Sequence, residues 1–275
     1  MTLPTHLPTA RIGVFDSGLG GLSVLRELQR QLPGASVLYL ADTLNVPYGD
    51  KPIEVVRDLA LLLTDQLVRA GAEIVVMASG TSTVAGLDAA QRRYPRLPIV
   101  GTVAPGASAA VSGLPGPIGV LATNATAHSR AFTLAIHTLD PSREVVEIGC
   151  PKFVPIVETG RADTEEARAA ALEYLRPLRD AGAQAIILGC THFPFLSGAL
   201  HTAAAEFGAP AFRPIFVDPS AAAVEAALAL LPSLADQSLA PGAVQFAATG
   251  NPEEFRWFAS RLLGEAIDFV APLTL

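Results

Sequence analysis

Two stretches of the sequence put small polar side chains directly after a run of apolar residues. The first, IVVMASGTST, spans Ile74–Thr83, and the second, IILGCTHFP, spans Ile186–Pro194. Each pattern is typical of a buried β-strand that runs into a polar turn. At the matching place the first carries the hydroxyl of Ser79 and the second the thiol of Cys190. We therefore expect two walls of one site, a thiol wall and a hydroxyl wall.

Cys190 is followed closely by an imidazole, because the sequence continues Thr191-His192. A neighbouring histidine favours the thiolate form of cysteine, which is the reactive form. A zinc site would need more Cys and His ligands than are grouped here, so no metal is expected. Nothing in the sequence marks the oxyanion hole of an acyl-transfer enzyme. The other cysteine, Cys150, precedes a proline, and we interpret it as a packed thiol.

A glycine-rich turn, Gly18-Leu19-Gly20-Gly21, follows the first predicted strand. Such a turn can hold a phosphate on its backbone N–H groups. This one lacks the G-x-G-x-x-G spacing, and no G-x-x-x-x-G-K-[ST] motif occurs in the chain. We therefore interpret it as a tight strand-to-helix turn that presents Asp16 and Ser17 to a ligand, without a nucleotide cofactor.

The elements that must position these residues alternate along the chain. Short Val-, Ile- and Leu-rich runs are apolar on both faces, which indicates a parallel sheet covered by helices on both sides. The predicted strands are Arg11–Asp16, Ser36–Asp42, Glu73–Ala78, Ile99–Val103, Ile118–Thr123, Val145–Gly149, Ala185–Gly189, Ile215–Asp218 and Val244–Ala248. Predicted helices between them include Leu22–Leu32, Ile53–Ala70, Thr164–Ala181 and Pro219–Leu231. The expected fold class is α/β, doubly wound, with mostly parallel sheets.

Ligands of such folds bind beyond the carboxyl ends of the strands. The residues that follow the predicted strands are small, polar or ionisable, which predicts a polar pocket there. Proline- and glycine-containing segments near residues 103 and 215 suggest that the chain leaves one unit, builds a second and returns. We expect a discontinuous first α/β domain, residues 1–103 plus 215–275, and a second domain, residues 104–214, with the site between them.

Composition excludes several classes of protein. Half of the 275 residues are hydrophobic and 16% are charged, which is typical of a compact globular chain. Lys and Arg number 19 against 26 for Asp and Glu, a net charge of −7, so nucleic acid is not an expected partner. No apolar run is long enough for a membrane span, and Met1–Arg11 lacks the apolar core of a signal peptide. Two unpaired cysteines fit a reducing cytoplasm.

Six ordered segments of this sequence resemble glutamate racemase. They read IGVFDSGLGGLSVLREL (12–28), YLADTLNVPYGDK (39–51), GVLATNATAHS (119–129), CPKFVPIVETG (150–160), LGCTHFPFL (188–196) and FAATGNPEEF (246–255). The resemblance implies two pseudo-symmetric α/β domains, usually in a homodimer. It also implies cofactor-independent interconversion of L- and D-glutamate, which supplies D-glutamate for peptidoglycan and so for the cell wall and cell shape.

Inversion at an α-carbon requires an acid–base group on each face of the planar intermediate. A thiol with a pKa near 8.5 changes protonation state at small cost near neutral pH. By resemblance, Cys190 is the base on the second domain, assisted by His192 and Glu158, and Asp16 assists the opposite face. The residues implied to bind the glutamate carboxylates and ammonium are Ser17, Pro47, Tyr48, Gly49, Gly80, Thr81, Thr123, Thr126 and Thr191.

The opening stretch departs from the family pattern, which is close to Ala-Cys-Asn-Thr where this chain has Ala78-Ser79-Gly80-Thr81. A serine hydroxyl is less acidic than a thiol by roughly five pKa units, or on the order of 7 kcal/mol. Asp16 can recover part of that loss by acting as a base through Ser79 or a water.

Three interpretations stay open from the sequence. The chain is a glutamate racemase with weakened or rerouted activity, or a one-thiol enzyme of the same superfamily, like arylmalonate decarboxylase, that acts on one face. The third is a non-catalytic amino-acid-binding or regulatory protein. The motifs alone do not separate glutamate from aspartate as the substrate.

Overall fold

The computed structural model describes residues 12–113, 115–208, 212–230 and 242–275. Within these ranges all nine predicted strands are present, apart from Arg11, which lies outside the described residues. A three-residue strand, β10, was not predicted. The strands are β1 Ile12–Asp16, β2 Val37–Ala41, β3 Ile74–Met77, β4 Ile99–Val100, β5 Ile118–Ala122, β6 Val145–Gly149, β7 Ala185–Leu188, β8 Ile215–Val217, β9 Val244–Ala248 and β10 Val270–Pro272.

Helices follow almost every strand, and the four predicted helices correspond to α1, α2, α8 and α10. The α-helices are α1 Leu22–Gln31, α2 Ile53–Arg69, α3 Gly80–Arg93, α4 Val103–Gly113, α5 Asn124–Ser129, α6 Ala131–Leu139, α7 Phe153–Glu158, α8 Glu165–Asp180, α9 Ser197–Glu206, α10 Pro219–Leu230 and α11 Pro252–Leu263. Two short 3₁₀ turns, η1 Tyr48–Asp50 and η2 Phe193–Leu196, complete the described elements. None of the described helices is both long and apolar enough to cross a membrane.

The strands form two separate sheets, in the orders β10-β9-β2-β1-β3-β4 and β6-β5-β7-β8, and every pairing is parallel. The central strands β1, β3, β5 and β7 are buried along their whole length. Helices on both sides of each sheet cover these side chains, which explains the unbroken apolar runs in the sequence. The predicted fold class, doubly wound α/β with parallel sheets, is confirmed.

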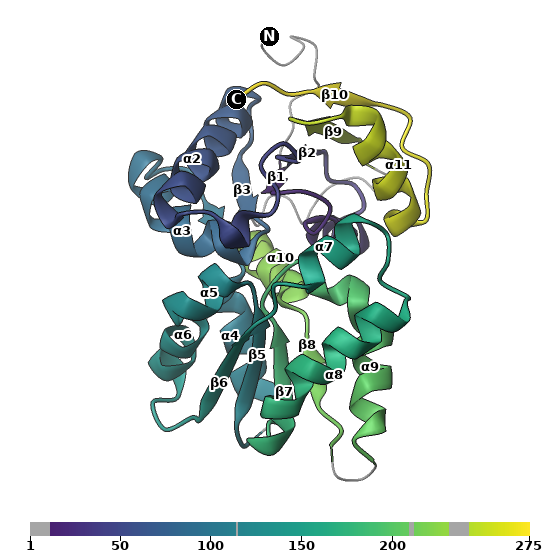
Figure 1. Ribbon diagram of the computed structural model, residues 1–275. Helices are drawn as coiled ribbons and strands as arrows, with labels where there is room; N and C mark the ends of the chain where they lie inside the picture. Colours follow the sequence, from purple (N-terminus) through teal and green to yellow (C-terminus); the bar gives the residue numbers. More distant parts are fainter. Residues whose placement is uncertain (1–11, 114, 209–211, 231–241) are drawn as a thin grey trace.

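We call the six-stranded sheet with its helices the first lobe and the four-stranded sheet with its helices the second lobe (Figure 1). Strand β8 lies in the second lobe, because Ile215–Val217 pairs with β7. The predicted domain boundary before residue 215 assigned this strand to the first domain. The pairing of β8 with β7 places it in the second lobe instead. The division into two domains stays a prediction.

The lobes are stacked one above the other, with α7 and α10 at the level where they meet (Figure 1). Helix α10 packs against α1 of the first lobe and α4 of the second. The polar residues that follow β1 and β3 contact those that follow β5 and β7. The fold therefore brings the carboxyl ends of the two sheets together, where the site was expected.

Candidate active site

Asp16 is the last residue of β1 and has no exposed surface. The N–H of Gly18 donates to its Oδ1 at 3.0 Å, and the hydroxyl of Thr191 in the second lobe donates to its Oδ2 at 3.0 Å. Burial raises the pKa of this carboxyl above its ordinary value, against the lowering by His192 and these hydrogen bonds. Asp16 is thus a buried acid–base group shared between the two lobes.

The glycine-rich turn after β1 lies directly against side chains of the second lobe. A Cβ atom added at Gly18 would lie 2.4 Å from Oε1 of Glu158, and one added at Gly20 would lie 2.4 Å from Nδ1 of His192. The N–H of Leu19 donates to Oε1 of Glu158 at 2.8 Å. The glycines are therefore required for close approach, and one turn N–H binds a carboxylate of the protein itself.

Three predicted residues of the second lobe form a chain of contacts. Sγ of Cys190 lies 3.6 Å from Nδ1 of His192, and Nε2 of His192 donates to Glu158 at 2.6 Å. Burial opposes the imidazolium, but the hydrogen bonds and charges of Cys190 and Glu158 outweigh it and raise the pKa of His192 well above its usual value. Cys190 is 7% exposed and His192 2%. The arrangement can hold a thiolate beside an imidazolium.

A cluster of three threonine hydroxyls joins the first turns of α3 and α5 across the lobes. Oγ1 of Thr81 lies 2.9 Å from Oγ1 of Thr123, which is 3.1 Å from Oγ1 of Thr126. Thr123 also caps α5 by accepting the N–H of Thr126. Three hydroxyls beside the N-terminus of the longer helix α3 suit an anionic group.

Ser79 lies at the end of β3 and caps α3. Its Oγ accepts the N–H of Ser82 at 3.2 Å, and the side chain is 6% exposed. A serine at this position stabilises the start of the helix, since it satisfies an N–H that has no partner within the helix. The hydroxyl therefore has a structural role besides any chemical one.

The loop that carries Pro47, Tyr48 and Gly49 is held by Asp42, which follows β2. The hydroxyl of Tyr48 donates to Asp42 at 2.6 Å, and Thr249 donates to the same carboxylate at 2.7 Å. The Val46–Pro47 peptide bond is cis. A Cβ atom at Gly49 would lie 2.7 Å from Cβ of Thr123, so this loop packs directly on the threonine cluster.

Two buried supporting residues were not among the predicted site residues. Asp42 was noted only as a strand end, although it holds the Tyr48 loop. Tyr39 donates its hydroxyl to the carbonyl of Gly18 at 2.8 Å and so supports the turn. A polar or aromatic side chain in or next to a predicted strand end is only a weak sign of a supporting role. The sequence does not show which residue it hydrogen-bonds to, because that depends on the packing.

Ser17 and Cys150, the remaining residues considered in the sequence, are both buried. Ser17 is buried beside Asp16. Cys150 is buried in the core of the second lobe, where desolvation raises its pKa well above the ordinary value, as expected of a packed thiol. Among the described residues, no group of three His, Cys, Asp or Glu side chains is placed to hold a metal ion.

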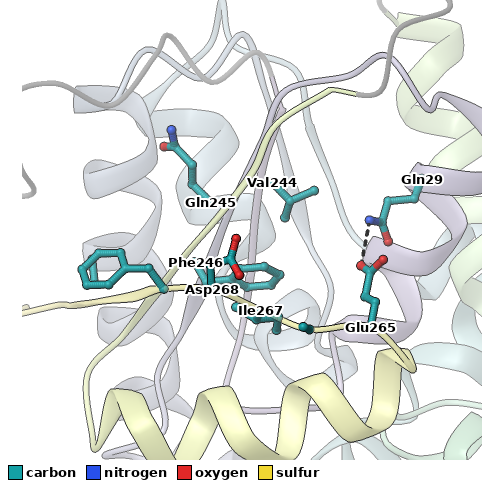
Figure 2. Close-up of a pocket in the computed structure, with 10 residues that line it drawn as sticks. Gln29, Val244, Gln245, Phe246, Glu265, Ile267 and Asp268 are labelled. Carbon is teal, nitrogen blue, oxygen red and sulfur yellow. Dashed lines mark hydrogen bonds between the residues drawn. The ribbon is translucent and has the colours of Figure 1, made fainter.

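The structure contains a pocket that reaches the site and another that is separate from it. One of about 350 Å³ reaches Glu158 and Leu19 from outside, between the Thr43–Val46 loop and α11. Another, of about 420 Å³, lies at β9 and β10, where Gln29 donates to Glu265 (Figure 2). No predicted site residue lines the second pocket.

Known proteins resemble this chain over almost its whole length. The model of the family described as Asp/Glu/Hydantoin racemase matches residues 12–227. Glutamate racemase from Desulforudis audaxviator is 35% identical over 96% of this chain and 97% of its own. The structure of glutamate racemase from Francisella tularensis in complex with D-glutamate has a TM-score of 0.86 at 28% identity, covering 98% of both chains. The enzyme from Thermus thermophilus in complex with beta-chloro-D-alanine has a TM-score of 0.83 at 37% identity, again covering 98% of both chains.

Proposed function

This chain belongs to the Asp/Glu/Hydantoin racemase family, and we propose from that premise that it is an amino-acid racemase that interconverts L- and D-glutamate. The observation that carries the proposal is the contact chain Cys190–His192–Glu158, which lies beside the buried Asp16 of the other lobe, since Asp16 accepts a hydrogen bond from Thr191. The relatives are named glutamate racemase, and one of their structures contains D-glutamate. These comparisons do not favour a one-thiol enzyme or a non-catalytic binding protein.

Cys190 is the acid–base group of the second lobe in this proposal. The thiolate takes the α-proton from one face of the substrate, and the resulting thiol returns a proton in the reverse direction. His192 is the imidazolium partner of the thiolate, because the hydrogen bonds on both ring nitrogens keep it protonated. Glu158 orients the ring and is itself held by the N–H of Leu19.

Asp16 and Ser79 serve the opposite face. A serine alkoxide is too costly at neutral pH, whereas burial raises the pKa of the Asp16 carboxyl and so favours its proton-donating form. The register of β1 on β3 pairs Phe15 with Met77, so Asp16 and Ser79 follow neighbouring strand ends. We assign the proton to Asp16 and its transfer to the α-carbon to the Ser79 hydroxyl or a water.

The threonine cluster and the N-terminus of α3 bind the substrate carboxylates in this proposal. Charge that develops on the carboxylate as the α-proton leaves is stabilised by donors that are already in place. The hydroxyls of Thr81, Thr123 and Thr126 hydrogen-bond to one another and can exchange these bonds for bonds to a carboxylate. Tyr48, Pro47 and Gly49 shape the wall beside them. Ser17 and Thr191 complete the binding surface, and Gly80 begins the helix that carries Thr81.

The cellular setting is part of the proposal. D-glutamate formed by this reaction would enter peptidoglycan, and hence the cell wall. The two described cysteines are free, which agrees with a cytoplasmic enzyme. We also propose a homodimer, which light scattering of the purified protein tests directly.

Proton–deuterium exchange in heavy water tests the function on each face. Either enantiomer of glutamate should gain deuterium at the α-carbon, and circular dichroism should show its conversion to the other; aspartate serves as the competing substrate. Cys190→Ala should lose about 10²–10⁴ in rate, the range of a general acid–base group. Cys150→Ala, the matched control, should keep the rate. Exchange of one enantiomer only supports the one-thiol alternative, and binding without exchange supports the binding protein.

A further inference from the structure

Gly80 lies at a close contact between the backbones of the two lobes. It is the first residue of α3 and is buried. A Cβ atom added to it would lie 2.5 Å from the main-chain carbonyl oxygen of Gly189, the residue after β7. Ordinary contact begins at 3.4 Å, so a side chain would need roughly 1 Å more room. Gly80 has no positive φ, so the need for glycine is steric rather than conformational.

The partner of this contact cannot move out of the way easily. The N–H of Gly189 donates to the carbonyl of Leu121 at 2.7 Å. A Cβ at Gly189 would itself lie 2.8 Å from the Phe132 ring, so the backbone there is packed on its other side too. Any side chain at residue 80 must therefore displace the start of α3 from the second lobe.

The two contacting residues each adjoin a group that the proposed reaction uses. Ser79 precedes Gly80, and Cys190 follows Gly189. A displacement of α3 therefore changes the separation of the hydroxyl and the thiol directly. Oxygen is smaller than sulfur and its bond to carbon is shorter, so a serine reaches less far than a cysteine. A hydroxyl at residue 79 needs the first lobe to lie closer to the substrate.

We propose that Gly80 sets the separation between the hydroxyl face and the thiol face of the site, so that Ser79 and Gly80 act as a pair. Gly80 is then a positioning residue, and this inference rests on the proposed racemase function. The absence of its side chain compensates in part for the shorter reach of Ser79.

Gly80→Ala tests the pairing, with Gly198→Ala as the matched control. Gly198 also lies in the first turn of a helix, α9, but a Cβ there meets only an atom of Asp163, at 4.0 Å. A misplacement of about 1 Å can cost about 100-fold in rate. Gly80→Ala should therefore lower kcat by about 100-fold with little change in KM, while Gly198→Ala should leave kcat unchanged. A kcat within about twofold of the unmodified protein would overturn the inference.

The proposed coupling of Ser79 and Gly80 also predicts how the effects of two substitutions combine. In a Ser79→Cys background the longer thiol bridges part of the added distance, so Gly80→Ala should cost about tenfold less there than beside serine. An equal loss in both backgrounds would show that the glycine is only a packing residue. Thermal unfolding of each variant separates a folding defect from a change in spacing.

A crystal structure with bound glutamate decides the point without any variant. The inference requires Gly80 and the Gly189 carbonyl to remain in direct contact around the ligand. If the lobes open so that a Cβ at residue 80 would fit at 3.4 Å or more, Gly80 does not set the spacing. Failure of the unmodified protein to exchange any deuterium would instead reject the racemase function, whatever this distance is.

Discussion

At the scale of single residues, a carboxyl group with no exposed surface is destabilising when it is ionised, because the protein interior solvates charge less well than water does. Asp16 is such a group, and burial raises its pKa. The same burial lets it hold a proton to a higher pH than an exposed aspartate does. The residue therefore connects the proposed chemistry with the pH dependence of stability.

We expect Asp16→Asn to stabilise the fold at neutral pH, to abolish racemisation, and to abolish exchange only of the enantiomer whose α-proton faces Asp16, because Cys190 still serves the other face. Because the folded pKa of Asp16 is raised, the stability due to its protonation is present at low pH and is lost as the pH rises through the folded pKa. Asparagine is neutral throughout, so the variant should unfold at a higher temperature at about pH 8, by about 2–4 °C per kcal/mol gained. The difference should shrink towards about pH 4.

Asp140→Asn is the control of opposite sign. Hydrogen bonds from Ser142 and Arg143 lower the pKa of the partly exposed Asp140. Its ionised form is therefore favoured by folding, and the asparagine variant should be less stable above the unfolded pKa of aspartate. Equal melting temperatures of Asp16→Asn and the unmodified protein at every pH would contradict the account of Asp16.

At the scale of elements, the residue proposed for the hydroxyl face also caps α3. Strand β3 ends at Met77, and the helix begins at Gly80, so Ser79 is fixed in place by the capping bond to Ser82. The same construction places Thr123 between β5 and α5. Strand-to-helix turns thus orient these hydroxyls, because the hydrogen bond that each one accepts from an N–H of its helix fixes the direction of the side chain.

Ser79→Ala should have two separable effects. Loss of the cap should lower the free energy of unfolding by about 1 kcal/mol. Thr164→Ala removes the equivalent cap of α8, where Thr164 accepts the N–H of Ala167, and should cost a similar amount. Only Ser79→Ala should also slow deuterium exchange. If exchange is unchanged in Ser79→Ala, the hydroxyl has no part in the proton path, and a water alone must serve Asp16.

At the scale of the whole molecule, the site exists only where the lobes meet. Thr191 of the second lobe donates to Asp16 of the first, and Thr81 contacts Thr123 in the same way. A ligand bound there contacts both lobes and stabilises their packed arrangement. Bound glutamate should therefore raise the free energy of unfolding of the whole protein, because it stabilises the contact between the lobes as well as each lobe.

Thermal unfolding with D-glutamate measures this coupling. A ligand at 100 times its Kd adds about 2.7 kcal/mol to the stability. Thr81→Val, which removes one hydroxyl of the threonine cluster, should reduce the shift at the same concentration. Thr138→Val alters an exposed threonine on α6 and should leave the shift intact. The same shift in Thr81→Val would place the carboxylates of glutamate elsewhere.

Much of the architecture followed from local patterns. The central strands are buried along their whole length and read as unbroken apolar runs, and the less buried β6 and β9 are still rich in apolar residues despite Glu147 and Gln245. All nine predicted strands were therefore found to within a few residues. The exceptions have physical reasons. Strand β10, Val270–Pro272, is too short to show a pattern, and it forms because β9 offers an edge for pairing. Strand β8 lies in the second lobe because it pairs with β7. Local sequence patterns do not predict this pairing, because the two strands are about 30 residues apart in the chain.

The sequence by itself determined the fold class, the family resemblance and the residue types at the strand ends, because these depend on periodicity and motif. Only the tertiary structure decided which strand ends meet. It showed that Glu158 binds both the glycine turn and His192, and that Asp42 holds the Tyr48 loop. It also showed that Gly80 lies in close contact with the main chain of Gly189. Such contacts join residues far apart in the chain, and their distances arise only when both lobes are packed.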